Sequence, residues 1–306
     1  MKNQTGSKFV FFGTPEFAAI ILEKLIAAGW PPALVVCNPD RPAGRKHLLT
    51  PPPAKIIAEK SGLPFYQPEK LSADKLKEKI SGAEFAVVAA YGKIISQKSL
   101  ILFPKGVIGV HPSLLPKYRG ATPLQSVLLK GEKTTGVSLF LIDKEIDHGP
   151  ILAKKKFLID PADNCEKLMR RAAAESADLL NEILPLFAAD KIRPKKQNDK
   201  AATFTEKFET SDAFVEFADL EKAVTRGGPI AKIIERKIRA FFPEPGVFTM
   251  KEIPGQPDNK GKIPPGQPRR IKILKAELIS EKKIKNPGDP MGRPQTSGAN
   301  RYFLIE

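Results

Sequence analysis

The stretch Lys8-Phe-Val-Phe-Phe12, followed by Gly13-Thr-Pro-Glu16, decides the fold of this chain. After Lys8 the run is wholly apolar, which is typical of a strand that is buried on both faces. Gly13 and Pro15 predict a turn directly after this strand. From Glu16 onward apolar residues recur with a helical period, at Phe17, Ile20, Ile21 and Leu25. A buried strand joined by a short turn to a helix is the opening of a βαβ unit.

The pattern continues outward from this unit. Short strand-like runs follow at 33–36, 84–90 and 106–111, and helical stretches at 51–60 and at 73–80, where Ser72 can act as the N-cap. Strands that alternate with helices predict an α/β fold with a Rossmann-like, mostly parallel sheet and helices on both faces. Two further strands at 134–141 and 150–158 and a helix at 162–186 complete a first domain, 1–188.

A basic segment, 189–208, is predicted to be a linker because it carries five Lys or Arg residues between 191 and 200 and few apolar ones. The second domain, 209–306, contains one helical stretch at 230–241 and β-like runs at 247–250, 271–278 and 302–305. A small β domain with one helix is compatible with an OB-like barrel. We expect this domain to bind nucleic acid.

The composition narrows the class of protein. The 306 residues include 50 Lys and Arg against 34 Asp and Glu, a formal net charge of +16 that favours a polyanionic partner, nucleic acid before membrane. Two distant cysteines, Cys37 and Cys165, argue against a disulfide scaffold or a zinc site and fit a reducing cytoplasm. No apolar run is long enough to span a bilayer. We expect a cytoplasmic monomer with no membrane partner.

Three histidines are present, and His111 is the best catalytic candidate among them. It follows the apolar run Val107-Ile-Gly-Val110, and sites in open parallel sheets form at the carboxyl ends of strands. A histidine that only caps a turn is an equal alternative on spacing alone. His47 lies in a basic loop, and His148 is expected to be exposed. Asp147 can serve chemistry, although a turn before Gly149-Pro150 explains an Asp there as well.

These residues lead to a family. The segment His111-Pro-Ser-Leu-Leu-Pro116 with Arg119-Gly120, and Ile146-Asp-His-Gly-Pro-Ile-Leu152 further on, resemble the folate-dependent formyltransferases. Four more segments resemble the members that act on methionyl-tRNA: Phe12-Gly-Thr-Pro-Glu-Phe-Ala18, Pro39-Asp-Arg-Pro-Ala-Gly-Arg45, Ala90-Tyr-Gly-Lys93 and Thr203-Phe-Thr-Glu-Lys207. The resemblance runs in order from residue 8 to about residue 250.

The resemblance implies a reaction and its residues. A formyl group would pass from 10-formyltetrahydrofolate to the amino group of methionine on initiator tRNA, without a metal. His111 would stabilise the oxyanion, and Asp147 would orient His111 and take up the proton through water. The folate donor would contact Ser113, Leu114, Leu115, Pro116, Tyr91 and Gly92. The tRNA would contact Arg41, Arg45, Lys46, Lys207 and Arg239.

Two departures from the family pattern stand out. Gly109 occupies the position where the family has an Asn, so the chain lacks a side-chain amide that could donate to the oxyanion. The Gly109 backbone, a water or Gln125 could compensate, or the protein could be slow or inactive. The chain also ends at Phe303-Leu-Ile-Glu306 without the family's usual tail, so an incomplete barrel and a shortened second domain are both open alternatives. The alternatives to the leading function are an amino-sugar-nucleotide formyltransferase and a tRNA-binding relative with impaired catalysis.

Overall fold

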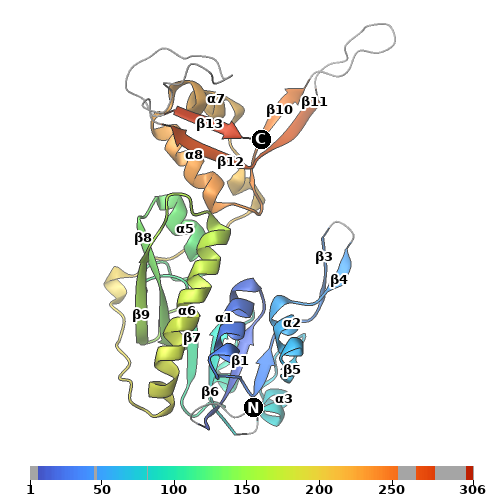
Figure 1. Cartoon of the computed structure of the whole chain (residues 1–306), viewed down its shortest axis with the longest axis vertical. Helices are drawn as coiled ribbons and strands as arrows, with labels where there is room; N and C mark the ends of the chain where they lie inside the picture. The colour runs from blue at the N-terminus through green and yellow to red at the C-terminus, as the bar shows by residue number, and fades with distance from the viewer. Residues whose placement is uncertain (1–5, 45–46, 81, 254–266, 280–300, 306) are drawn as a thin grey trace. The chain divides into compact units, whose positions relative to one another are not determined.

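The computed structural model describes residues 6–44, 47–80, 82–253, 267–279 and 301–305. The chain divides into two compact units. The first unit comprises residues 1–123, 134–159 and 168–206, and the second comprises residues 124–133, 160–167 and 207–306. Figure 1 shows the whole chain.

A seven-stranded sheet forms the centre of the first unit (Figure 1). Its strands lie side by side in the order β5-β2-β1-β6-β7-β8-β9. The first five run parallel, β8 is antiparallel to β7, and β9 is antiparallel to β8. The bounds are β1 (Lys8–Gly13), β2 (Leu34–Val36), β5 (Phe65–Tyr66), β6 (Ala83–Ala89), β7 (Val107–His111), β8 (Thr134–Leu141) and β9 (Ile151–Leu158). The predicted Rossmann-like, mostly parallel sheet is therefore confirmed.

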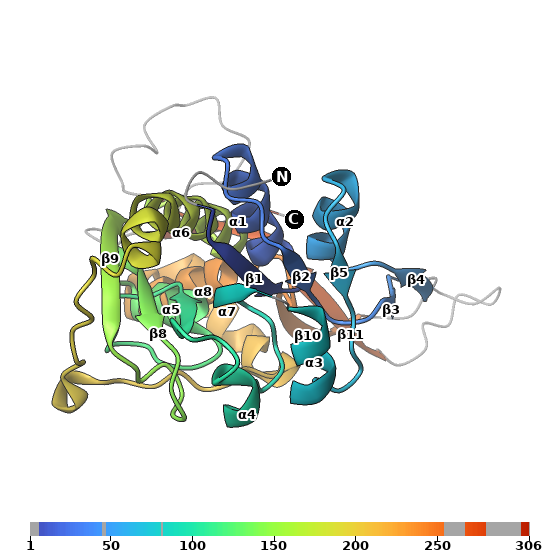
Figure 2. The ribbon, with the colours of Figure 1, turned by 90° about the horizontal axis from the view of Figure 1, so that it is seen from below.

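Helices cover both faces of this sheet, as predicted. The helices are α1 (Glu16–Ala27), α2 (Pro53–Lys60), α3 (Ala73–Lys79), α4 (Gln97–Leu100) and α6 (Cys165–Ala188). Figure 2 shows α1 and α6 on one face and α3 and α4 on the other.

Alternate residues of β1 serve the two faces. Phe9 stacks on Phe85, whose ring meets Phe187 of α6 edge-on at 5.4 Å. Phe12 points the opposite way and meets Phe103, just after α4, at 6.2 Å. Residues Phe9 to Phe12 are fully buried, which is why the run contains no polar side chain.

The loop predicted after β2 contains a short hairpin. Strands β3 (Arg41–Ala43) and β4 (Leu48–Thr50) pair antiparallel, with Arg41 opposite Thr50. All the described side chains of this hairpin are exposed, so no burial pattern in the sequence could reveal it. Arg45 and Lys46 lie outside the described residues. Ser72 stands at the N-cap of α3 as expected, but its side chain makes no capping hydrogen bond.

The second unit differs more from expectation. Besides α5 (Pro123–Lys130), most of which belongs to this unit, it contains α7 (Phe217–Arg226) and α8 (Gly228–Ala240). Only the second of the pair α7 and α8 was predicted. Helix α7 was missed because its ten residues include four charged ones, and only Leu220 and Ala223 are buried. These two pack with Ile234 and Ile238 of α8 in one apolar cluster.

The strands of the second unit form two separate pairs in the part of the chain that the structure describes. Strand β10 (Val247–Ile253) pairs with β11 (Gln267–Ile273), and β12 (Lys275–Ile279) pairs with β13 (Arg301–Ile305), both antiparallel. The single run expected at 271–278 is thus two strands that meet at Leu274. A closed OB-like barrel is not seen among these strands. None of the described helices is long and apolar enough to cross a membrane.

Candidate active site

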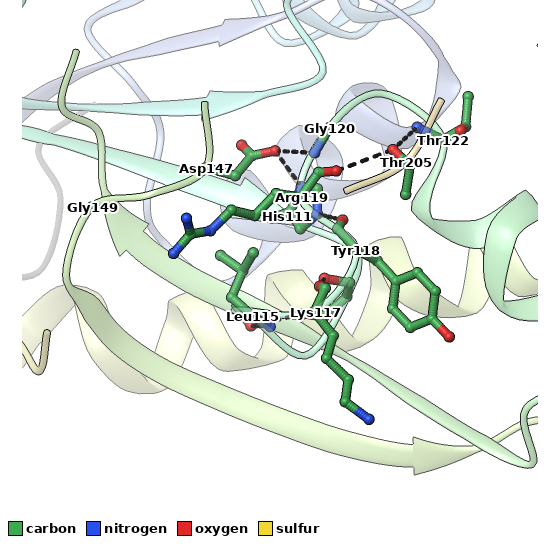
Figure 3. Close-up of polar contacts among 12 residues, drawn as sticks. His111, Leu115, Lys117, Tyr118, Arg119, Gly120, Thr122, Asp147, Gly149 and Thr205 are labelled. Carbon is green, nitrogen blue, oxygen red and sulfur yellow. Dashed lines mark hydrogen bonds and ion pairs between the residues drawn. The ribbon is translucent and has the colours of Figure 1, made fainter. Parts of the chain in front are cut away.

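The imidazole of His111 lies at the carboxyl end of β7 and is nearly buried (Figure 3). Its Nε2 is 2.7 Å from the carbonyl oxygen of Tyr118. Because a carbonyl can only accept, Nε2 must carry the hydrogen. The other nitrogen, Nδ1, is 3.5 Å from Oδ2 of Asp147. The two predicted catalytic side chains, 36 residues apart in sequence, are therefore brought together.

Asp147 is held by the turn that connects β8 to β9. Its Oδ2 accepts a hydrogen bond of 2.8 Å from the backbone N–H of Gly120, as Figure 3 shows. Its backbone is left-handed, with φ of 48°, which is unusual for a residue other than glycine. At Gly149 a Cβ atom would lie 1.7 Å from the carbonyl oxygen of Leu141, so only glycine fits there. The turn is both a tight connection and the carrier of the carboxylate.

His148 was expected to be exposed, and the structure corrects this. Only 24% of its side chain is exposed, and its Nδ1 lies 2.7 Å from Oδ2 of Asp143. The hydrogen bond to Asp143 is the main reason that the pKa of His148 is raised above its usual value. Nε2 lies 3.5 Å from Oδ1 of Asp199, a residue far along the chain. His148 thus takes part in an ion-pair cluster beside the site.

The loop after His111 uses its polar atoms to hold its own shape. The hydroxyl of Ser113 donates to the carbonyl oxygen of Lys117 at 2.6 Å. Ser138, on the neighbouring strand β8, donates to the carbonyl of Ser113 and accepts from the N–H of Leu115. Ser113 and Leu115 are fully buried, whereas Leu114 and Pro116 are partly exposed. Of the residues expected to contact folate in this loop, only the latter two have accessible side chains.

A segment from the predicted linker is bonded to this site. We name Lys195–Glu206 the strap; it includes the short 3₁₀ helix η1 (Asp199–Ala201). At one end Lys195 exchanges two backbone hydrogen bonds of 2.8 Å with Ile151. At the other end the N–H of Arg119 donates to Thr203 and the N–H of Thr205 donates to Arg119. Sequence reasoning missed this role, because the strap is basic, lacks apolar periodicity and contacts residues that are distant in the sequence.

Gly109, the position of the family Asn, is closed off by an aromatic ring. It lies opposite Phe140 in the antiparallel β7–β8 pair. A Cβ atom at residue 109 would come within 2.5 Å of the Phe140 ring and 3.1 Å of Ile142 Cγ1. The structure therefore leaves no room for a larger side chain at this position unless the ring moves. Gln125, one of the possible substitutes for the amide, belongs to the other compact unit.

Tyr91 and Gly92 follow β6 at the carboxyl end of the sheet. The carbonyl oxygen of Tyr91 accepts from the Thr14 hydroxyl and from the Asn38 side-chain amide, both at 3.2 Å. These bonds tie together the segments after β1, β2 and β6. Burial raises the pKa of Tyr91 to about 12. Its side chain is buried, whereas Gly92 is exposed.

The residues expected to contact tRNA differ in availability. Arg41 is exposed but forms a 2.5 Å ion pair with Glu69. Arg239 is largely buried: it pairs with Glu235 and donates to the carbonyl of Asp163 at 3.1 Å. Lys207 is exposed. Within the described ranges, no group of three His, Cys, Asp or Glu residues is placed to hold a metal ion.

Comparisons with known proteins show the family of the chain. Residues 7–184 match the model of the family described as formyl transferase. The chain is 38% identical to a methionyl-tRNA formyltransferase of Chloroflexus aurantiacus, over 98% of this chain and 91% of the relative. It is 39% identical to that of Thermotoga maritima, over 78% of this chain and 74% of the relative.

Solved structures show the same fold at low identity. A sugar N-formyltransferase from Shewanella has a TM-score of 0.61 at 17% identity, covering 90% of this chain and 99% of its own. An N-formyltransferase from Helicobacter canadensis has a TM-score of 0.59 at 18% identity, covering 90% and 89%. At such identities the likeness is one of fold alone.

Proposed function

The chain belongs to the formyl transferase family, and on this premise we propose that it formylates the amino group of methionine on initiator tRNA, with 10-formyltetrahydrofolate as the donor. The observation that carries the proposal is the pairing of His111 with Asp147 at the end of β7. It occurs in a chain that is 38% identical, along nearly its whole length, to a methionyl-tRNA formyltransferase.

The reaction forms one C–N bond and breaks another. The methionine amine attacks the formyl carbon, a tetrahedral oxyanion develops, and the bond to the folate nitrogen then breaks. That nitrogen takes a proton as the attacking amine loses one. Donors and positive charge beside the oxyanion lower the barrier. His111, whose Nε2 faces the Tyr118 carbonyl and whose Nδ1 faces Asp147, is the side chain expected to stabilise the oxyanion.

Asp147 is the group that can receive the proton. Its Oδ2 is engaged by Gly120 and faces His111, whereas Oδ1 has no hydrogen-bond partner within the described residues. This second oxygen is available to accept a proton from the amine, directly or through one water. The two carboxylate oxygens of Asp147 would then have different roles: Oδ2 would orient His111 and Oδ1 would take the proton.

The accessible members of the expected folate pocket are Gly92, Leu114 and Pro116. A donor that binds at the carboxyl end of the sheet can touch these residues directly. Ser113, Leu115 and Tyr91 are buried and would act by shaping the pocket.

The charge distribution supports a tRNA partner. Residues 1–205 carry 31 basic and 20 acidic side chains, and residues 206–306 carry 19 and 14, so the excess is +11 and +5. Phosphates can therefore be neutralised in both parts of the chain. Exposed Lys207 and Arg41 are the described candidates with the best access. We infer a monomer that acts in the cytoplasm, where charged tRNA is available.

A second function is favoured by one observation. Residue 109 is a glycine and Phe140 fills the space beside it, so this position offers no side-chain donor. Loss of such a donor costs about 10²–10³ in rate in other enzymes. A tRNA-binding protein with impaired catalysis is the function that this observation favours. The sugar-nucleotide alternative has only structural likeness below 20% identity behind it.

One assay separates these functions. The purified protein is incubated with charged initiator tRNA and 10-formyltetrahydrofolate, and formylmethionyl-tRNA is measured by acid-gel electrophoresis. We expect turnover, and we expect His111→Ala to lower it by about 10² or more. Binding of the charged tRNA without any transfer would establish the impaired relative instead. Transfer to an amino-sugar nucleotide, and not to tRNA, would refute both.

A further inference from the structure

Gln197, in the strap, has a side-chain amide whose hydrogen-bonding positions are all occupied. The residue is 6% exposed. Its Oε1 accepts from Nε and Nη2 of Arg119 at 3.2 and 2.9 Å. Its Nε2 donates to the carbonyl oxygens of Asp147 and Gly149 at 2.9 and 2.8 Å. Two acceptor and two donor positions are all that an amide possesses.

The neighbours of Gln197 fix the direction of this amide. A guanidinium can only donate and a carbonyl can only accept, so the oxygen must face Arg119 and the nitrogen must face the turn. Arg119 is itself 4% exposed and makes a further 2.8 Å ion pair with Asp199. This hydrogen bond from Arg119 is the main reason that the pKa of Asp199 is lowered.

The backbone around Gln197 is anchored on both sides. Lys195 is paired with Ile151 two residues before it, and Thr203 accepts from Arg119 six residues after it. Gln197 therefore bridges two segments that carry the site. One segment contains Arg119 and its two neighbours. The carbonyl oxygen of Tyr118 faces His111, and the N–H of Gly120 donates to Asp147. The other segment is the Asp147–Gly149 turn.

We propose that Gln197 is a positioning residue for formyl transfer, which acts by holding the Asp147–Gly149 turn so that the Asp147 carboxylate stays between His111 and Gly120. The left-handed backbone of Asp147 is a strained conformation that persists only where the surroundings hold it. Gln197 donates to the carbonyl oxygens of Asp147 and Gly149, the two residues on either side of His148. This inference rests on the proposed function, because it assigns Gln197 a part in that reaction.

Substitution by Glu tests the donor half of the amide alone. Gln197→Glu keeps the size and the acceptor that faces Arg119, but it cannot donate to the turn while ionised. Gln197→Met removes both halves at similar length. The control is Asn198→Ala, because Asn198 is exposed and its side chain only caps η1 by accepting from the N–H of Lys200.

Two measurements are made on each full-length variant. We expect both Gln197 variants to lower kcat about 10- to 100-fold, the size of effect that a misplaced catalytic group produces. KM for the folate donor and for tRNA should stay within about twofold of wild type, on the same argument that only the reacting groups are displaced. Amide hydrogen exchange at Gly120, whose N–H is bound by Asp147, should become at least about tenfold faster, as loss of a hydrogen bond of ordinary strength implies. Asn198→Ala should match wild type in both.

The exchange measurement distinguishes failure of this inference from failure of the proposed function, since it needs no turnover. Wild-type kcat together with wild-type exchange at Gly120 in Gln197→Glu would overturn the inference while leaving formyl transfer intact. An equal loss of kcat in Asn198→Ala would show that the effect comes from loosening of the strap as a whole. This result would also overturn the inference. If Gln197→Met does not fold, the isosteric Glu variant decides.

Discussion

The segment His111–Gly120 and the strap Lys195–Glu206 contribute to one site but differ in what their sequences reveal. The first contains a histidine, a serine and an arginine in a compact motif at the end of a buried strand. The second has the composition of a basic linker. Yet Arg119 and Thr203 are joined by a backbone hydrogen bond of 2.8 Å, and Gln197 reaches the turn of Asp147. We infer that the reacting side chains are His111, in the first segment, and Asp147, and that the strap positions the turn that carries Asp147.

The largest effect is expected where the chemistry is concentrated. We predict that His111→Ala and Asp147→Asn each lower kcat by about 10² or more, the usual contribution of general acid–base catalysis. Folate binding should change little, because the loop after His111 is held by Ser113 and Ser138, which remain. Steady-state turnover and equilibrium binding of the folate donor are measured for each variant. Near-normal turnover in both would refute the site.

The next largest effect is expected on stability, at the contact between Gly109 of β7 and Phe140 of β8. We predict that Gly109→Asn destabilises the fold by about 1–3 kcal/mol, because its Cβ overlaps the Phe140 ring and overpacking has costs of this order. The double variant Gly109→Asn with Phe140→Ala should recover part of this loss. Urea unfolding gives the free energies, and a single variant as stable as wild type would contradict the clash.

The double variant also sharpens the question of compensation at residue 109. If its turnover exceeds that of wild type, the natural site lacks a donor that an Asn can supply. If its turnover is unchanged, a backbone group or a water already fills this role. Phe140→Ala alone is the control for the cavity that removal of the ring creates.

The sequence predicted the parts of the molecule that depend on local patterns. The strand after Lys8, the helix after Glu16 and the strand before His111 each bury a continuous or periodic apolar set, and all three occur close to the predicted bounds. The pairing of His111 with Asp147 was found only through the family resemblance. From the residues alone, a turn before Gly149-Pro150 was the stronger explanation for Asp147.

The remaining parts depend on partners that are distant in sequence. Nothing near Gln197 indicates that it will be buried between Arg119 and the Asp147 turn. Phe140 is an ordinary apolar residue of a strand, and only the strand register places it opposite Gly109. Helix α7 was missed because it buries few of its side chains. Each of these features follows from tertiary pairing, which single-sequence periodicity does not contain.

Outside both segments, a smaller effect is expected at the β3–β4 hairpin. We predict that Arg41→Ala raises KM for tRNA a few-fold. The slope of log tRNA affinity against log salt concentration should become shallower by about one, as loss of one phosphate contact implies. The ion pair with Glu69 provides a matched control, because Glu69→Gln frees the guanidinium and should strengthen tRNA binding. Folate affinity should be unaffected in both. An unchanged KM for tRNA in both variants would mean that Arg41 serves only the hairpin.

The smallest effect is expected at the ion-pair cluster of His148, where the Asp147–Gly149 turn meets the strap. The pKa of His148 is raised in the folded protein, chiefly by its hydrogen bond to Asp143 and with smaller contributions from Glu145 and Asp199. A raised pKa means that the charged histidine stabilises the fold fully below its unfolded pKa of about 6.5, and that this contribution is lost as pH rises through the folded pKa.

We therefore predict that Asp143→Asn lowers Tm more at pH 6 than at pH 9.5. The difference should be small, since the pair is partly exposed and screened by solvent. Thermal unfolding of wild type and variant at both pH values gives the comparison. An equal loss at both would show that the 2.7 Å contact acts as a neutral hydrogen bond, and that the charge on His148 does not join the turn to the strap.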